Sequence, residues 1–439
     1  MSVLALLVLG PPALGAAPAA AVEPPASEEP TNPRPEVRRS PVELRVRSLP
    51  TPTAPLRGRI PPNEPFTVLM RVGGERCAGD GWGMLQGGYT CLAKTQVVDE
   101  TPVALPRLVP FDPPTPEEYR AYVRDGTWPR DPDTTEALLP FVYGKAWRHW
   151  AGTNYASLEA WERGDPPVAT LDADHKYHFV AAVEAARGTA LVRDDGRVVP
   201  LADAFIYPVS RFHGAELTGA DALAPGEMQA WVLPYGGANL REAPNGAVGL
   251  VLPHQTPLRV VPTANPRWVE APDALGPDVP GYVAVSVLRF ARPRARPVGL
   301  APDAVWVDID VSEQVLMLML GDTPIFATLV STGLVERDTP PGVYQMLDKT
   351  IHGDMASLPD AEEPYHVESV PWVMHFRPRY ALHGVFWHWG FGSRASHGCV
   401  NLAPLDARRI FDAIQPRLPD GWSSVIAGPD EPGTTVRIR

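Results

Sequence analysis

Polar and apolar residues alternate in short runs along most of this chain, and this period of two predicts β-strands. In the clearest case every second residue from Val305 to Val311 is apolar. Residues 315–320 form a continuous apolar run, which suits a strand buried on both faces. Short polar turns separate these runs from a third, at 325–330. The three runs predict a β-meander that opens a domain extending over residues 304–439.

Two earlier segments show the same alternation between turns rich in proline and glycine. Residues 41–99 combine alternating apolar positions with the stretch "GDGWGMLQGGYTC", which predicts a small β-barrel. Residues 228–293 repeat the theme, with a strand at Leu240 and Arg241 and a turn at 244–246. We interpret them as a second barrel of the same kind. The alternative is an unrelated Pro-rich β domain with a similar pattern.

The region between these two modules, residues 100–227, is predicted to be β-rich with short helices. The stretch "PTPEEYRAYVRDGTW", residues 114–128, favours a short helix with Tyr119 and Tyr122 on one side. Further on, "ALVRDDGRVVPLADAFIYPVS" predicts two strands joined at the turn 194–196. Neither element indicates a function for this region.

The N-terminal sequence is typical of an exported protein. An apolar run at residues 3–10 precedes the small residues Ala19–Ala21, as in a secretory signal peptide over residues 1–21. No Lys or Arg precedes the run and two prolines interrupt it, so a low-complexity tail on a cytosolic protein is the alternative. The run is too short to cross a bilayer. Residues 22–40, rich in Pro, Glu and Ala, predict a linker without a core.

Composition bounds the class of protein. The 439 residues exceed one ordinary core, and 53 prolines fit loops and β structure better than helix bundles. A formal net charge of −12 argues against general nucleic-acid binding, which needs a basic face. We therefore expect a mainly β protein of several modules, with no nucleic-acid partner and no transmembrane span.

The three cysteines divide into a pair and a single thiol. Cys77 and Cys91 flank a Gly-rich stretch, and in an exported protein such a pair is expected to form a disulfide. Cys399 is then the odd thiol, and it could be a small buried hydrophobic residue, as lone cysteines often are. In an oxidising compartment an unpaired thiol is a liability unless its reactivity is used. Its neighbours favour the reactive interpretation.

The surroundings of Cys399 are typical of a nucleophilic site. The stretch "SRASHGCVNLAP" surrounds it with Ser396, His397, Gly398 and Asn401. A thiol needs an adjacent base or a positive field to react at neutral pH. His383, at the end of the apolar strand "YALHG", is the best candidate for that base. His397 is the alternative, but in a tight turn two residues before the cysteine its side chain is expected to point away.

A helix is predicted directly after this motif. Pro404 suits a first helical turn, and the apolar residues that follow at helical spacing are Ala407, Ile410, Phe411 and Ile414. Cys399 is therefore expected in the loop that leads into the helix. Backbone N–H groups there could hold an oxyanion, and the helix N-terminus would favour the thiolate.

These residues resemble the signature of the L,D-transpeptidase (YkuD-type) catalytic domain, whose enzymes remodel bacterial peptidoglycan. That motif is His-Gly, a spacer, Ser/Thr-His-Gly-Cys, a hydrophobic residue and Asn or Arg, and the chain meets every element. The resemblance covers residues 304–426 and implies a β-sandwich with a short helix after the cysteine motif. Residues 41–99 similarly resemble a bacterial SH3-like module, through "LRVRSLPT" and the later "GW". We extend that interpretation to residues 228–293.

The resemblance implies a role for each motif residue and needs no metal or other cofactor. Cys399 would attack an amide carbonyl to form a thioester, and His383 would take the thiol proton and later handle the acceptor amine. The Gly384 carbonyl would orient the imidazole of His383. The N–H groups of Gly398 and Cys399 would line the oxyanion hole. The turn would be shaped by hydrogen bonds of Ser396, His397 and Asn401.

The implied donor is a stem tetrapeptide of peptidoglycan, cleaved between the L-centre of a diamino acid and the terminal D-Ala. Transfer to an amine of another stem gives a 3→3 crosslink, whereas transfer to water would make the protein an L,D-carboxypeptidase. The implied location is the periplasm or cell envelope, where SH3-like modules would bind wall glycan or peptide. A wall-binding protein with a dormant site is the alternative from another class, and the intact Cys399 and His383 argue against it.

Other interpretations of nearby residues are weaker. A papain-like protease is disfavoured because its cysteine precedes its histidine in the chain. Zinc-type ligands are present, but their spacing matches no common site: His375, His383, His388, His397 and Cys399. The candidates for the substrate cleft, with core packing as the alternative, are Trp372, Tyr380 and His388.

Overall fold

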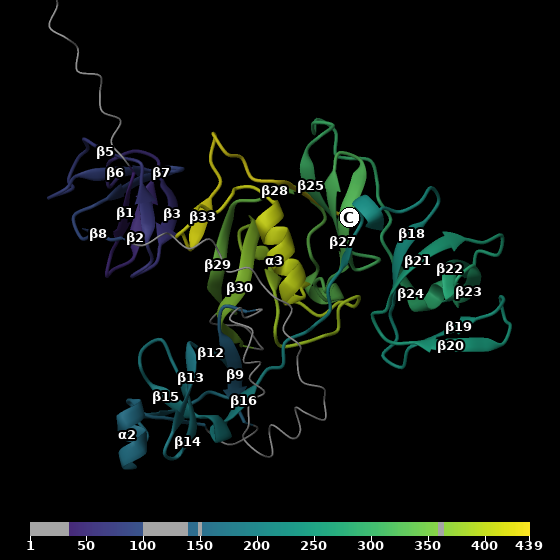
Figure 1. Ribbon diagram of the computed structural model, residues 1–439, viewed down its shortest axis with the longest axis horizontal. Helices are drawn as coiled ribbons and strands as arrows, with labels where there is room; N and C mark the ends of the chain where they lie inside the picture. Colours follow the sequence, from purple (N-terminus) through teal and green to yellow (C-terminus); the bar gives the residue numbers. More distant parts are fainter. Residues whose placement is uncertain (1–34, 100–138, 148–151, 359–363) are drawn as a thin grey trace, which may run out of the picture.

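The chain is mainly β, as predicted, and Figure 1 shows a central green and yellow body with smaller modules around it. The computed structural model describes residues 35–99, 139–147, 152–358 and 364–439. Its two α-helices within these ranges are α2 (Leu158–Arg163) and α3 (Pro404–Ala413). The predicted signal peptide, most of the predicted linker and the predicted helix at 114–128 lie outside the described residues.

The predicted meander opens the C-terminal domain and lies in a six-stranded sheet. The sheet has the order β17-β27-β26-β25-β34-β28. Its strands are β17 (Ala215–Glu216), β25 (Val305–Asp310), β26 (Val315–Leu320), β27 (Thr323–Leu329), β28 (Gly342–Gln345) and β34 (Thr435–Ile438). Val307 and Leu316 face one core, whereas Trp306 and Met317 face another. The apolar run of β26 is therefore buried on both sides, as its sequence predicted.

The second part of this domain carries the motif residues. Its strands are β29 (Asp348–Ala356), β30 (His366–Arg377), β31 (Tyr380–Gly384), β32 (Val400–Leu402) and β33 (Ser424–Ile426). Helix α3 packs against β30 and β31, and the predicted apolar positions Ala407, Ile410 and Phe411 are buried there. Leu316, Met374 and Phe411 belong to one core, so both sheets and the helix enclose the same apolar interior.

The first module begins earlier than predicted. Its strands are β1 (Glu36–Arg39), β2 (Leu44–Arg47), β3 (Leu56–Ile60), β4 (Phe66–Val68), β5 (Met70–Val72), β6 (Trp82–Leu85), β7 (Gly88–Cys91) and β8 (Gln96–Val97). Strand β1 lies within the segment 22–40 that was predicted to be a linker, and it pairs with β4 and β8. The charged sequence of β1 concealed this strand, because Arg38 is only 3% exposed and forms an ion pair with Asp80.

The middle region forms β structure that joins the C-terminal domain. Its strands are β9 (Val142–Ala146), β10 (Thr153–Asn154), β11 (Ala169–Thr170), β12 (His175–Phe179), β13 (Ala181–Ala185), β14 (Gly188–Val192), β15 (Val198–Pro200) and β16 (Ala204–Ile206). Strands β14 and β15 pair on either side of the turn 194–196, as predicted. Strand β12 pairs in parallel with β30, with Lys176 opposite Val367. The middle region therefore extends the sheet that carries the motif.

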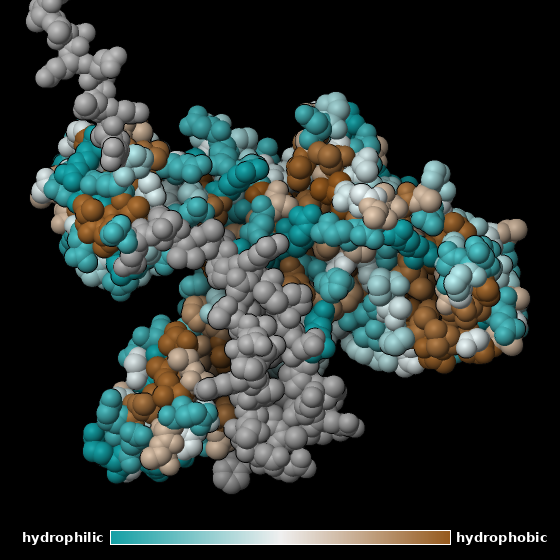
Figure 2. All heavy atoms as spheres, viewed as in Figure 1, coloured by the Kyte–Doolittle hydropathy of each residue, from teal (hydrophilic) through white to brown (hydrophobic). Residues whose placement is uncertain are grey.

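The segment 228–293 also forms a β module. Its seven-stranded sheet consists of β18 (Met228–Val232), β19 (Ala238–Arg241), β20 (Val248–Leu252), β21 (Pro257–Pro262), β22 (Trp268–Gly276), β23 (Val279–Ala284) and β24 (Leu288–Phe290). Figure 2 shows brown, hydrophobic atoms on this module, where Leu250 and Val251 of β20 are exposed. The SH3-like identity of this module and of the first one stays a prediction.

All three modules are fixed to the C-terminal domain. One sheet runs from the middle region through the C-terminal domain into the first module, in the order β16-β9-β12-β30-β29-β33-β3-β2-β7-β6-β5. The module of residues 228–293 inserts Trp231 into the core that contains Phe391. Its Arg289 side chain also donates to the Gly392 carbonyl, at 3.1 Å. The loop between His383 and Ser396 is therefore supported from this side.

Short 3₁₀ turns complete the fold: η1 (Leu201–Asp203), η2 (Gly219–Asp221), η3 (Val285–Val287) and η4 (Val335–Arg337).

Candidate active site

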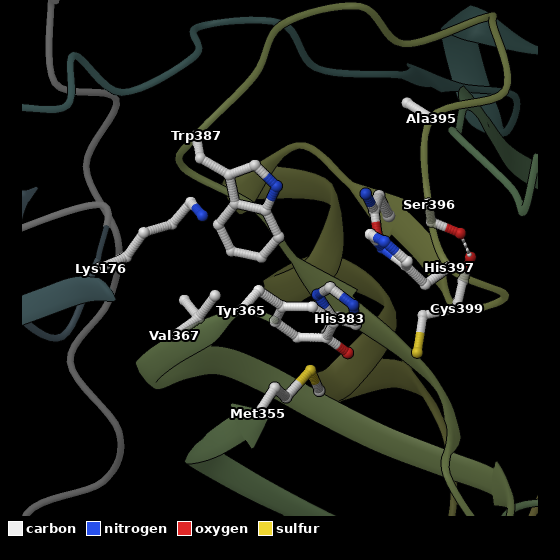
Figure 3. Close-up of a pocket in the computed structure, with 11 residues that line it drawn as sticks. Lys176, Met355, Tyr365, Val367, His383, Trp387, Ala395, Ser396, His397 and Cys399 are labelled. Carbon is white, nitrogen blue, oxygen red and sulfur yellow. Dashed lines mark hydrogen bonds between the residues drawn. The ribbon is translucent and has the colours of Figure 1, made fainter. Parts of the chain in front are cut away.

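A cavity of about 130 Å³ brings the predicted motif residues together (Figure 3). Five of them line it: His383, Ser396, His397, Cys399 and Asn401. The other lining residues are Lys176, Met355, Tyr365, Val367, Trp387 and Ala395. The cavity therefore combines the candidate nucleophile and base with residues that the sequence analysis did not single out.

The strand pairing explains how residues separated in sequence reach one cavity. Strand β31 lies parallel to β32, with His383 opposite Asn401 and Gly384 opposite Leu402. The chain leaves β31 after Gly384, loops away and returns to β32 immediately after Cys399. The spacer of the motif is thus the crossover that a parallel pair requires.

His383 is held as a neutral base. Only 3% of it is exposed, and its Nδ1 lies 3.1 Å from the Gly384 carbonyl oxygen. A carbonyl can only accept, so Nδ1 carries the proton and Nε2 keeps its lone pair. Burial lowers the pKa of His383 to about 4, although the bond to Gly384 opposes this shift. The orientation by Gly384 that the resemblance implied is therefore present.

The Cys399 thiol is protonated in this resting site. Burial raises its pKa, and a hydrogen bond from the Ala381 backbone N–H offsets part of that rise. Its Sγ lies 3.8 Å from the Arg379 carbonyl oxygen, which can accept the S–H proton. Cys399 does not lie in a loop that leads directly into the helix, as was expected, because strand β32 separates it from the start of α3 at Pro404. Burial is the largest cause of the shift in its pKa.

Ser396 shapes the turn that presents Cys399. Its Oγ accepts the Gly398 N–H at 3.1 Å and donates to the Cys399 carbonyl at 2.5 Å. Gly398 has φ +119°, a conformation that favours glycine. The Gly398 N–H is donated to Ser396 in this structure. Of the two predicted oxyanion donors, the Cys399 N–H is therefore the stronger candidate.

A buried threonine supports the same turn from below. Thr339 Oγ1 donates to the Gly398 carbonyl at 2.9 Å and accepts the Gly333 N–H at 2.9 Å. The Thr332 carbonyl accepts the N–H groups of Ala395 and Ser396. Only the structure shows that these threonines hold the turn.

The expectation that His397 points away is wrong. His397 is exposed, but it lines the cavity, and its ring centroid lies 5.1 Å from that of Tyr365. Burial is the main cause that raises the pKa of the Tyr365 phenol. Tyr365 therefore stays neutral and can donate its O–H into the cavity. His383 remains the better base because its Nδ1 is fixed by Gly384.

The three predicted cleft residues do not line the cavity. Trp372 is 2% exposed and packs against Phe411 with a ring-centroid distance of 5.5 Å, which is the core alternative. Tyr380 lies behind the turn, against Gly398. Asn401 Nδ2 donates to His388 Nε2 at 3.0 Å, and burial lowers the pKa of His388 to about 4. His388 therefore supports Asn401 from outside the cavity.

Two further predictions about cysteine and histidine have outcomes. The structure joins Cys77 and Cys91 in a disulfide, so Cys399 is the free thiol of the chain. Of the five residues considered as zinc ligands, His375 does not line the cavity, and its Nδ1 instead lies 2.8 Å from an Asp348 carboxylate oxygen. Among the described residues no group of three or more His, Cys, Asp or Glu is arranged to hold a metal ion.

Comparison with known families agrees with this geometry. Residues 304–438 match the family model of the L,D-transpeptidase catalytic domain. The C-terminal domain is an L,D-transpeptidase catalytic domain. Enzymes of that family act on the peptidoglycan of the cell wall. No curated protein matches the chain.

Solved structures of L,D-transpeptidases resemble part of the chain. The catalytic domain from Enterococcus faecium has 19% identity and a TM-score of 0.25, and the match covers 31% of this chain and 98% of that one. L,D-transpeptidase 3 from Mycobacterium tuberculosis has 20% identity and a TM-score of 0.26, with 38% and 75% covered. The enzyme from Stackebrandtia nassauensis has 21% identity and a TM-score of 0.23, with 34% and 58% covered. Within the described ranges, none of the helices has the length and apolar character needed to span a membrane.

Proposed function

We propose that this protein is a peptidoglycan L,D-transpeptidase that uses Cys399 as its nucleophile. The donor is a stem tetrapeptide, the leaving group is D-Ala, and the acceptor is an amine of another stem, which gives a 3→3 crosslink. One observation carries the proposal: Cys399 and His383 line the same cavity, and the Gly384 carbonyl leaves Nε2 of His383 unprotonated.

The first half-reaction acylates the enzyme. Sγ of Cys399 attacks the carbonyl carbon before the terminal D-Ala while the thiol proton passes to Nε2 of His383. A C–S bond forms, the C–N bond to D-Ala breaks, and the imidazolium returns the proton to the leaving amine. The products are free D-Ala and a thioester on Cys399.

The second half-reaction releases the acyl group. An acceptor amine attacks the thioester, His383 takes the proton from that amine, and the sulfur leaves as the thiol. The new bond is an amide between two stems. If water takes the place of the amine, the same steps give an L,D-carboxypeptidase and a free tripeptide.

The resting protonation states favour general-base catalysis over a preformed ion pair. The pKa of His383 is lowered to about 4, and the pKa of Cys399 is raised, so thiol and imidazole are both neutral at pH 7. The proton must therefore move as the C–S bond forms. The developing oxyanion accepts the Cys399 N–H, which lies on the turn fixed by Ser396.

The disulfide supports an exported location, in the periplasm or cell envelope. The Cys77–Cys91 bridge requires an oxidising compartment to persist. In that location a free thiol is retained where its chemistry is used. The first module and the module of residues 228–293 would hold the catalytic domain near the wall polymer by binding glycan or peptide.

Product masses test the proposed reaction. The disulfide-bonded protein and its Cys399→Ala variant are incubated with purified tetrapeptide muropeptides. A crosslinked dimer that has lost one D-Ala, formed only by the unmodified protein, supports transpeptidation. Formation of the tripeptide alone would indicate that the protein is an L,D-carboxypeptidase. Unchanged substrate in both samples favours a wall-binding protein with a dormant site.

A further inference from the structure

The described residues that line the candidate cavity include basic side chains and no acidic one, although the whole chain is acidic. These eleven residues include Lys176, His383 and His397 but neither Asp nor Glu. The formal net charge of the chain is −12. A recess of this composition suits an anionic group on the substrate.

Lys176 is the fixed cation of this recess. It comes from β12 of the middle region, and its Nζ lies 5.9 Å from the ring centroid of Trp387. No ion pair of its ammonium occurs among the described residues. Burial, together with the charge of Lys145, lowers the pKa of Lys176 against the opposing charge of Asp174. A half-buried ammonium that makes no direct ion pair among the described residues favours a ligand that brings a carboxylate.

The strand that carries Lys176 is held in place by the C-terminal domain. The carboxylate of Glu368 on β30 accepts the His178 backbone N–H at 3.1 Å and the Arg193 guanidinium at 3.0 Å. The Tyr143 hydroxyl donates to the Ser369 carbonyl at 2.6 Å. Because Lys176 lies opposite Val367 in the parallel pair, both side chains belong to the same face. Lys176 is therefore a positioned part of the cavity.

Lys176 lies far from the nucleophile within the cavity. Figure 3 shows Lys176 and Trp387 at one end and Ser396 and Cys399 at the other, with His383 and Tyr365 between them. A group bound by Lys176 is thus separated from the carbonyl under attack. A stem peptide carries such groups, because it has carboxylates besides the amide that is cleaved.

We propose that Lys176 binds a carboxylate of the stem peptide, so that the middle region supplies a specificity-determining residue to the active site. This inference rests on the proposed function, since it takes the stem peptide as the substrate. It gives the pairing of β12 with β30 a functional consequence, since this pairing brings Lys176 to the cavity. It also assigns the middle region a part in recognition.

Binding of three tetrapeptides to the Cys399→Ala variant tests this inference without turnover. One peptide has all carboxylates free, one has the carboxylates on the acyl side amidated, and one has only the terminal carboxylate amidated. Calorimetry gives Kd for each peptide with and without Lys176→Gln. We expect Lys176→Gln to weaken binding of the free peptide about tenfold, as loss of a charged hydrogen bond does. For the peptide in which amidation has already removed the contact with Lys176, Lys176→Gln should cause no further loss of affinity. That peptide identifies the carboxylate that Lys176 binds.

Two matched variants complete the design. Lys176→Arg keeps the charge and should bind the free peptide nearly as well as the lysine. Lys145→Gln removes a nearby charge that does not line the cavity, and it should leave Kd unchanged. The inference is overturned by equal losses for all three peptides, by the same loss in Lys145→Gln, or by no binding of any peptide. If binding depends on Lys176 but the unmodified protein releases no D-Ala, the proposed function fails and the inference on recognition stands.

Discussion

A Cβ atom placed on Gly398 would lie 2.8 Å from Cε1 of Tyr380. The turn that presents Cys399 therefore packs directly against an aromatic ring of β31, and only glycine fits there. Tyr380 is itself held beneath the guanidinium of Arg377, 5.3 Å from the ring centroid. The position of the thiol thus depends on a close contact outside the cavity.

Gly398→Ala should greatly reduce acylation, because the turn must move away from Tyr380. Gly196→Ala is the matched control: its φ is +82°, but an added Cβ meets nothing within 4 Å. Both variants place alanine at a positive φ, which L-residues rarely adopt. Only the first carries the clash. Thermal unfolding and acylation rates check this, and equal activity in the two variants would contradict the role of the contact.

His383→Ala should lower turnover by a factor of about 10²–10⁴, the usual contribution of a general base. His397→Ala should have a much smaller effect, because the Gly384 carbonyl orients the buried His383, whereas the His397 side chain is exposed. Rates on the same donor peptide measure both. A larger loss of turnover for His397→Ala would identify His397, which also lines the cavity, as the general base.

The pH dependence of reactivity follows from the two shifted groups. Because the pKa of Cys399 is raised, its alkylation by iodoacetamide should keep accelerating with pH through 9.0, the ordinary thiol value. Because the pKa of His383 is lowered to about 4, kcat/KM should stay constant as the pH falls through 6.5, the ordinary histidine pKa. It should decrease as the pH approaches 4. A plateau in alkylation below neutral pH would instead indicate a preformed thiolate–imidazolium pair.

Glu368→Gln should loosen the middle region from the C-terminal domain. Burial acts to raise the pKa of Glu368. Hydrogen bonds from His175 and His178 and the charge of Arg193 outweigh this effect and hold the pKa below its ordinary value. Its stabilising contribution is therefore complete above the unfolded pKa of about 4.5 and is lost as pH falls through the lower folded value. We expect the variant to be less stable by about 3 kcal/mol at pH 7, as for other broken buried pairs.

Denaturant unfolding at pH 7 measures this change. Glu184→Gln is a matched control, because Glu184 pairs with Thr189 on the exposed hairpin of β13 and β14 and should change stability little. A Glu368→Gln protein that is as stable as the control would contradict the anchoring role of this carboxylate. If Lys176 is positioned through this anchor, Glu368→Gln should also weaken binding of the free tetrapeptide.

The sequence predicted the motif residues of this site better than the other residues that line the cavity. His383, Gly384, Ser396, Gly398 and Cys399 have local contacts that follow from a short motif, so their arrangement could be predicted. The meander and helix α3 were predictable for the same reason, since hydrophobic periodicity within one segment determines which face is buried.

The rest of the cavity depends on pairing between distant segments. Lys176 reaches the site only because β12 pairs with β30, and nothing in its own sequence neighbourhood indicates that partner. Trp372 was predicted to reach the cleft, but β30 turns it into the core against Phe411. Aromatic residues near a motif suit either position, and long-range strand register decides between them.

The central claim is that Cys399 carries the acyl group, and the intact mass of the acylated protein tests it most directly. Brief incubation with a tetrapeptide donor and rapid acid quenching should add the mass of the donor minus D-Ala, located by fragmentation to the peptide that contains Cys399. The adduct should be absent from Cys399→Ala and sensitive to hydroxylamine, as a thioester is. An adduct of the same mass on Cys399→Ala, or turnover by that variant, would contradict the account.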